Sequence, residues 1–171
     1  MQIIFETPRL YLRRFTDADS SLVFYLNSFQ EVVEYVHEPV HTCVEFSRNV
    51  LFEHILPQYA LYNLGRLAVY VKENDEFIGW CGLKFRPELN EIDLGYRYIP
   101  SSWGKGFATE AAKHTLDYGF SKLQLKEIIG RAHVDNKASL SVLKKIGMTY
   151  LRNEVVDHCP VETYHSINPN V

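Results

Sequence analysis

The sequence predicts a single-domain mixed α/β (α+β) fold, in which helices flank a central, twisted and mostly antiparallel sheet of about seven strands. The chain has 171 residues, a common length for one domain. Hydrophobic residues make up 46% of it, enough for a core without disulfide or metal staples. Strand-like and helix-like periods follow the order βαα–βββ–αβ–αββ, which lacks the strict βαβ alternation of a doubly wound sheet. We therefore expect residues 1–171 to form one domain.

The N-terminal third is expected to hold one strand and two helices. Residues 9–15 alternate apolar and polar side chains, which is typical of a half-buried strand. The polar cluster 16–19 predicts a helix N-terminus, and apolar residues continue at helical spacing to Phe29. Residues 43–56 repeat apolar side chains every three or four positions. They predict a second helix that ends near Pro57, because proline disrupts a helix interior.

The middle of the chain predicts three strands and then a helix. Residues 67–71 and 77–85 are rich in β-branched and aromatic side chains and flank a polar turn, which indicates a hairpin. Residues 93–99 predict a third strand, because a proline follows directly. Between residues 106 and 120, apolar side chains recur every four positions, which indicates an amphipathic helix.

The last third predicts a strand, a short helix and two final strands. The strand covers residues 127–134, and the helix covers 137–146 because Gly147 can end a helix in the left-handed conformation. The final strands are expected near 148–156 and 161–168.

Composition and charge argue against several classes of protein. A net charge of −3 is not the basic footprint of a general nucleic-acid binder. No apolar run approaches the ~20 residues needed to cross a bilayer, and the apolar N-terminal patch is too short for a signal peptide. Three widely spaced cysteines are expected to be free thiols in a reducing compartment. We therefore expect a cytoplasmic protein with neither nucleic acid nor membrane as partner.

A metal site is not expected. His37 and His41 stand four apart, a spacing that suits a metal on a helix, but Pro39 between them breaks such a helix.

The most informative stretch is the glycine-rich turn that leads into the helix starting near residue 106. Gly104 and Gly106 carry no side chains that would keep a phosphate from the first helix amides, and Lys105 adds a cation. Residues 101–150 also hold eight Lys/Arg and four Asp/Glu, which is consistent with a local anionic ligand or simply with a solvated helix surface. Taken alone, two glycines before a helix also suit a plain turn.

Several motifs in the same order resemble the GNAT acyltransferases. The stretch WGKGFATEA places Gly106 and Ala108 at the glycine and glycine/alanine positions of the family loop, whereas Trp103 departs from the usual Gln/Arg. The segments 6–13, 134–139 and 143–148 fit the subgroup that resembles ribosomal-protein N-terminal (alanine/serine) acetyltransferases. The resemblance covers residues 6 to about 150.

This resemblance implies a GNAT-like fold that uses acetyl-CoA as acyl donor, without a metal. The pantetheine arm is then expected beside Tyr96 and Tyr98, with Asn136 and Ser139 facing the arm or the sulfur. The expected pyrophosphate ligands are the loop residues Trp103, Gly104, Lys105, Gly106, Phe107 and Ala108. The acceptor is a primary amine, on a protein N-terminus or a small molecule, and a homodimer is a further expectation, because dimers are common among such proteins.

Glu91 and Ser139 are the candidate catalytic residues. Glu91 and Asp93 share a strand face, and like charges on one face disfavour ionisation of both, which suits a general base. The alternative is a hairpin edge with solvated acids. Many GNAT enzymes carry a tyrosine that acts as general acid at the position where this chain has Leu143. Ser139 lies one helical turn earlier on the same face and is the candidate to replace it. Ser139 could equally bond to the backbone and Asn136 could cap the helix.

The leading hypothesis is an acetyl-CoA-dependent N-acetyltransferase in which the amine attacks the thioester directly. Leu143 in place of tyrosine motivates the alternative, a non-catalytic acyl-CoA sensor or partner subunit. A third option is an unrelated nucleotide-phosphate binder with the same type of loop.

Overall fold

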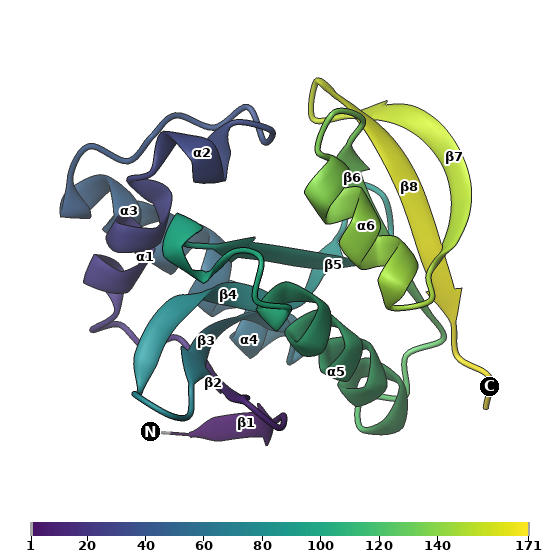
Figure 1. The fold of residues 1–171 in the computed structure, drawn as a ribbon, viewed down its shortest axis with the longest axis horizontal. Coiled ribbons are helices and arrows are strands. Elements are labelled where there is room, and N and C mark those ends of the chain that lie inside the picture. Colours follow the sequence, from purple (N-terminus) through teal and green to yellow (C-terminus); the bar gives the residue numbers. More distant parts are fainter. Residues whose placement is uncertain (1, 171) are drawn as a thin grey trace.

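The computed structural model describes residues 2–170, which form one eight-stranded sheet with helices packed on it (Figure 1). The strand order is β1-β2-β3-β4-β5-β6-β8-β7, and within the described residues only β5 and β6 run parallel to each other. The mixed, mostly antiparallel sheet that the sequence predicts is confirmed. The strands are β1 (Ile3–Glu6), β2 (Leu10–Arg14), β3 (Gly65–Val71), β4 (Glu76–Arg86), β5 (Glu91–Tyr98), β6 (Glu127–His133), β7 (Thr149–Val156) and β8 (Cys159–Ile167).

The sheet has one strand more than the sequence pattern indicates. β1 is four residues long and lies at the sheet edge, where it pairs only with β2. Four residues are too few to show an alternating period, so the pattern of this segment did not reveal a strand.

The second expected helix extends beyond Pro57. α3 (Val44–Val50) leads through a π-helical turn, η1 (Leu51–Ile55), into α4 (Leu56–Tyr62). Pro57 lies in the first turn of α4, where its missing N–H and fixed φ are tolerated. The other helices are α1 (Ser20–Asn27), α2 (Gln30–Val33), the 3-10 turn η2 (Pro100–Ser102), α5 (Phe107–Ser121) and α6 (Lys137–Lys145).

Helices cover both faces of the central strands. Neighbouring residues of a strand point to opposite faces, so Trp80 and Cys81 of β4 mark the two sides. Cys81 Sγ lies 3.4 Å from Thr115 Oγ1 of α5, and we call this side the α5 face. Arg97 stacks on Trp80 and donates to Asn27 of α1 (2.7 Å), and we call this side the α1 face.

The sheet opens between β5 and β6. These two strands pair only at Asp93–Ile129 and Leu94–Gly130, although β5 continues to Tyr98 and β6 continues to His133. β5 stays paired with β4, and β6 stays paired with β8, along the rest of their length. The facing edges of β5 and β6 therefore diverge toward their C-terminal ends, and η2 and the glycine-rich turn follow directly on β5 (Figure 1).

Candidate active site

The glycine-rich turn is exposed and leads straight into α5. Gly104 (φ 73°) and Gly106 (φ 80°) both adopt the left-handed conformation that disfavours a side chain. A Cβ on Gly104 would have no neighbour within 4 Å, and one on Gly106 would meet only Arg9 Nη2, at 3.3 Å. Gly106 is the N-cap of α5 and brings no side chain to the first amides of the helix. The residues present thus fit an anionic group such as a phosphate.

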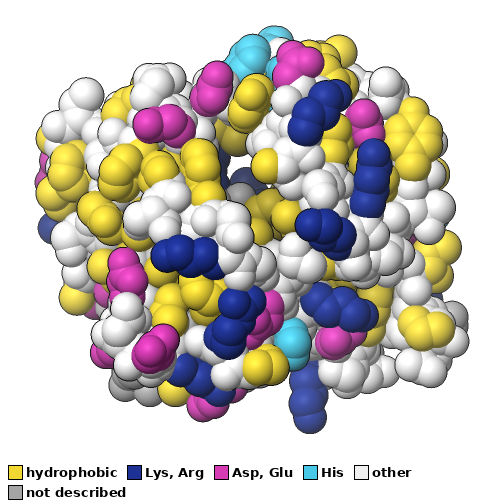
Figure 2. Space-filling model, viewed as in Figure 1, with side chains coloured by type: hydrophobic (Ala, Val, Ile, Leu, Met, Phe, Trp, Pro, Cys, Tyr) yellow, Lys and Arg dark blue, Asp and Glu magenta, His cyan; other side chains and the backbone are white. Residues whose placement is uncertain are grey.

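Basic side chains surround this turn on the face of the molecule shown in Figure 2. Lys and Arg side chains there spread over α5, α6 and the turn before α5, and a hollow separates α6 from the N-terminal helices (Figure 2). Lys105, Lys137, Lys144 and Lys145 are exposed residues of these segments. The basic count of this part of the sequence therefore corresponds to a real surface of positive charge beside the opening between β5 and β6.

Trp103 fastens the turn to β5. Its indole Nε1 donates to the backbone oxygen of Tyr98 (2.7 Å), while about half of the side chain stays exposed. A Gln or Arg at this position could not bury an equally large apolar surface while making that bond. The tryptophan thus holds the turn against the end of β5.

Tyr96 and Ser139 meet across the opening. The Tyr96 hydroxyl lies 3.0 Å from Ser139 Oγ and also donates to the Ser139 backbone oxygen (3.1 Å). Burial raises the pKa of Tyr96 well above its usual value, so its hydroxyl stays protonated at neutral pH. The structure therefore brings two of the predicted residues into direct contact, one on β5 and one on α6. The sequence gives no signal for this pair, because 43 positions separate them.

The remaining predicted residues near the opening have structural roles. Asn136 caps α6, because its Oδ1 accepts a hydrogen bond from the Ser139 amide (3.1 Å). The Tyr98 side chain is buried on the α5 face, so only its backbone can reach the opening. Leu143 is fully buried, and a Cβ on Gly130 of β6 would lie 2.8 Å from its Cδ2. Leu143 thus packs α6 against β6.

Glu91 lies at the start of β5, the end away from the glycine-rich turn. It starts the strand, so it is seven residues, or roughly 23 Å of extended chain, from Tyr98. Its carboxylate binds Arg131 (2.6 Å), and Asp93 binds Arg66 (2.6 Å). Each carboxylate is thus paired with its own guanidinium. The two acids on this face of β5 are neither left to repel each other nor simply solvated. The role of Glu91 as the base stays a prediction, and the repulsion that motivated it is replaced here by two ion pairs.

Comparison with known proteins gives the family. Residues 9–149 match the family model described as "Acetyltransferase (GNAT) domain". The chain belongs to the GNAT acetyltransferase family. It is 32% identical over 142 residues to the uncharacterized N-acetyltransferase p20 of Bacillus licheniformis, with 82% of this chain and 79% of p20 covered. It is 31% identical to the uncharacterized N-acetyltransferase YoaA of Bacillus subtilis, with 84% and 81% covered.

Solved structures agree with this assignment. A GNAT-family acetyltransferase of Bacillus anthracis superposes with a TM-score of 0.82 at 25% identity, covering 98% of this chain and 99% of that one. A spermidine N-acetyltransferase of Vibrio cholerae, solved with CoA and spermine, has a TM-score of 0.78 at 20% identity, with 94% and 96% covered. At that identity the second likeness shows the fold alone. Family and relatives together make this chain an acetyl-CoA-dependent N-acetyltransferase.

The α1 face of this GNAT enzyme carries a second polar network at the opening. Arg97 Nη1 donates to Asn27 Oδ1 (2.7 Å) and Glu38 Oε2 (2.8 Å). Burial opposes ionisation of Glu38, but the Arg97 guanidinium holds the pKa of Glu38 below its usual value. His133, at the end of β6, accepts a hydrogen bond at Nδ1 from the Asp135 amide (3.1 Å), so its neutral form carries the proton on Nε2.

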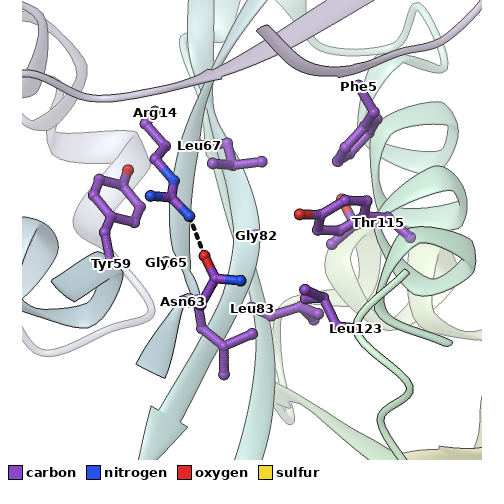
Figure 3. A pocket seen from close by; sticks show the side chains of 12 residues that line it. Phe5, Arg14, Tyr59, Asn63, Gly65, Leu67, Gly82, Leu83, Thr115 and Leu123 are labelled. Carbon is purple, nitrogen blue, oxygen red and sulfur yellow. Dashed lines mark hydrogen bonds between the residues drawn. The ribbon is translucent and has the colours of Figure 1, made fainter. Parts of the chain in front are cut away.

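The pocket in Figure 3 plays no part in this site. It lies on β3 and β4 between residues of α4 and α5, and its volume of about 20 Å³ suits a single water molecule. Arg14 hydrogen-bonds Asn63 at its side (Figure 3). Among the described residues no three His, Cys, Asp or Glu side chains gather as metal ligands, and no helix in that range is long and apolar enough to cross a bilayer.

Proposed function

We propose that the enzyme binds acetyl-CoA with its phosphates at the turn 103–108 and its pantetheine arm along β5. The observation that carries this proposal is the diverging edge of β5 beside an exposed, side-chain-free helix N-terminus. The backbone groups of residues 95–98 that face β6 have no strand partner there. An extended arm with two amide groups could pair with them as an added strand does.

The acceptor amine then attacks the thioester from the α1 face. It must arrive as the free amine, because an ammonium has no lone pair, and protein or bulk water can take the proton. A backbone N–H near Tyr96 donates to the carbonyl oxygen as charge develops there. As the new C–N bond forms, the nitrogen gives up a further proton to water, and the C–S bond breaks with its electron pair on the thiolate sulfur. The Tyr96 hydroxyl turns its single proton from the Ser139 backbone oxygen to the departing thiolate, while Ser139 Oγ, 3.0 Å away, donates to the Tyr96 oxygen.

This arrangement supports turnover despite the leucine at position 143. A thiol with a pKa of about 8.5 leaves with little help, so a hydrogen-bond donor suffices where other family members use a tyrosine of the helix. Tyr96 provides a hydroxyl from the neighbouring strand. Leu143 in place of a tyrosine is therefore not, by itself, an argument for a non-catalytic acyl-CoA sensor.

We further propose a primary amine as acceptor, on a protein N-terminus or a small molecule, and action in the cytoplasm. The relatives differ in acceptor: one solved structure is named a spermidine N-acetyltransferase, and another is named an acetyltransferase of the alanine of ribosomal protein S5. A homodimer remains an expectation that light scattering would test.

Calorimetric titration with acetyl-CoA tests the cofactor site, and Gly106→Glu is the informative variant. The new carboxylate would stand where phosphate oxygens are expected, so binding should be lost. Gly147→Glu is the matched control, since Gly147 also has a positive φ (85°) and open space around it but follows α6. Equal affinity of both variants for acetyl-CoA would contradict the assignment of the turn.

Thiol release with a panel of amines tests turnover and identifies the acceptor class. The panel should contain peptides that begin with alanine or serine, polyamines and free amino acids. Release of CoA that depends on one amine class supports the enzyme, whereas tight acetyl-CoA binding without release under any amine would favour the sensor.

A further inference from the structure

Arg9 reaches from the N-terminal hairpin onto the turn before α5. Its Nε donates to Glu110 Oε2 (2.6 Å), and its Nη1 donates to the backbone oxygen of Lys105 (2.8 Å). The guanidinium carbon lies 4.6 Å from the centre of the Phe107 ring. Three contacts thus fix a cation against the residues proposed to receive the phosphates of acetyl-CoA.

Glu110 sets the direction of this side chain. Besides Arg9 Nε, its carboxylate accepts hydrogen bonds from the Arg9 amide (2.8 Å) and from the Thr7 hydroxyl (2.6 Å). Burial favours the neutral acid, yet these hydrogen bonds lower the pKa of Glu110 below its usual value, so the group is ionised at neutral pH. Glu110, in the first turn of α5, is thus tied to the N-terminal hairpin by three hydrogen bonds. It links the segment 6–13 to the segment 103–111, although Arg9 and Glu110 are 101 positions apart in the sequence.

One edge of the guanidinium stays available. Within residues 2–170, Arg9 Nη2 has no hydrogen-bond partner, and it lies 3.3 Å from the point where a Cβ of Gly106 would be. The side chain is 48% exposed. A guanidinium with Nε and Nη1 occupied by protein and Nη2 open beside a helix N-terminus has the geometry to bind one more anionic oxygen.

We propose that Arg9 is a direct ligand of a phosphate group of coenzyme A. The proposal rests on the proposed binding of acetyl-CoA at the turn 103–108 and adds a charged ligand from another part of the chain. Two groups of the same chemistry could accept this hydrogen bond, the pyrophosphate and the 3′-phosphate. Because the contact is equally strong before and during acyl transfer, its loss should raise the KM for acetyl-CoA and leave kcat unchanged.

The test compares Arg9→Gln, Arg9→Lys and wild type by calorimetry with CoA and with 3′-dephospho-CoA. Arg9→Gln should weaken CoA binding about tenfold to a hundredfold, the usual effect of a lost charge-assisted hydrogen bond. If the 3′-phosphate is the partner, dephospho-CoA should bind wild type and Arg9→Gln equally well. If the pyrophosphate is the partner, the Arg9→Gln substitution should weaken the binding of CoA and of dephospho-CoA by the same factor.

Arg9→Lys separates a ligand from a residue that only shapes the turn. Lysine keeps the charge but cannot reproduce the fork that holds Glu110 and Lys105, so a ligand role predicts partial rescue of CoA affinity. Arg14→Gln, a loss of the same charge on β2 away from the turn, is the control and should bind CoA as wild type does.

Two outcomes would overturn the proposal. One is Arg9→Gln binding CoA within twofold of wild type. The other is Arg9→Lys binding no better than Arg9→Gln, because the role would then be structural. Thermal unfolding of each variant checks that it is folded. Absence of CoA binding to the wild-type enzyme would instead refute the proposed function, so the two failures are distinguishable.

Discussion

At the scale of single residues, burial decides what Tyr96 can do. A phenol with a pKa far above 7 is a poor acid but a permanent hydrogen-bond donor, and Ser139 Oγ at 3.0 Å holds it in place. Such a donor can stabilise a thiolate as it departs without itself becoming ionised. The hydroxyl pair should therefore act as one unit.

Tyr96→Phe should lower kcat roughly 10- to 100-fold at neutral pH and change the KM for acetyl-CoA little, because the hydrogen bond to sulfur strengthens only as charge develops. Ser139→Ala should cause a smaller loss, and the double variant should be no worse than Tyr96→Phe. Steady-state thiol release measures these effects. Tyr164→Phe is the control, since Tyr164 is also buried but bonds Glu162 in β8. Unchanged kcat in Tyr96→Phe would leave positioning and backbone polarisation as the mechanism.

The prediction for Glu91 shows what a residue pattern leaves out. The alternation of a strand correctly puts Glu91 and Asp93 on one face. Their partners, Arg131 and Arg66, lie 40 and 27 positions away in sequence. No local pattern reports which strands become neighbours, so the arginines that neutralise these acids could not be predicted.

At the scale of elements, β7 is paired with β8 through its backbone, and one carboxylate adds side-chain hydrogen bonds to β8 and β6. All but two of its residues are exposed. Glu154 accepts hydrogen bonds from Thr163 of β8 (2.6 Å), from Arg152 (2.9 Å) and from Arg131 of β6 (3.2 Å). Burial works against its charge, but these three donors lower the pKa of Glu154 to about 2. The ionised form is thus strongly favoured in the folded state.

Glu154→Gln should destabilise the enzyme by about 1–3 kcal/mol at pH 7, because the buried Arg131 loses an ionic partner. A carboxyl group with a lowered folded pKa contributes stability above its unfolded pKa near 4.5, and that contribution disappears as pH falls toward 2. Urea unfolding from pH 3 to 7 should show the variant and wild type converging in acid. Glu127→Gln, which removes a half-exposed acid bonded to His165, should cost little. A difference independent of pH would contradict the role of the ionised carboxylate.

The elements themselves were the most predictable level. Alternation, runs of β-branched and aromatic residues and turn residues located seven strands, and apolar side chains four positions apart located α5, because these patterns act within a few residues. The prediction placed the end of the second helix at Pro57. In the structure a π-helical turn precedes the proline, and a new helical segment, α4, begins at Leu56. Pro57 therefore lies in a first turn, where proline is tolerated. The contact of Arg9 with Glu110 depends on packing across 101 positions and had no local signal.

At the scale of the whole molecule, the sheet consists of two parts joined by the two residue pairs that connect β5 to β6. β1 to β5 form the larger part, and β6, β8 and β7 form the smaller one. An arm bound between β5 and β6 would pair with backbone groups that otherwise face water. Binding of acetyl-CoA should therefore add contacts between the two parts of the sheet and raise the free energy of unfolding.

Hydrogen exchange with and without acetyl-CoA measures this effect. Amides of residues 95–98 and of the turn 103–108 should exchange more slowly with ligand, whereas those of β3, paired on both sides in either state, should not change. At a concentration 100 times the dissociation constant, the ligand adds about 2.7 kcal/mol of stability, or a rise of roughly 5–11 °C in Tm for a chain of this length. Protection of the turn without protection of residues 95–98 would mean that the phosphates bind as proposed while the arm lies elsewhere. Protection confined to residues outside both segments would contradict the whole binding geometry, because the side-chain-free turn and the unpaired edge of β5 are the two features that direct the cofactor to this opening.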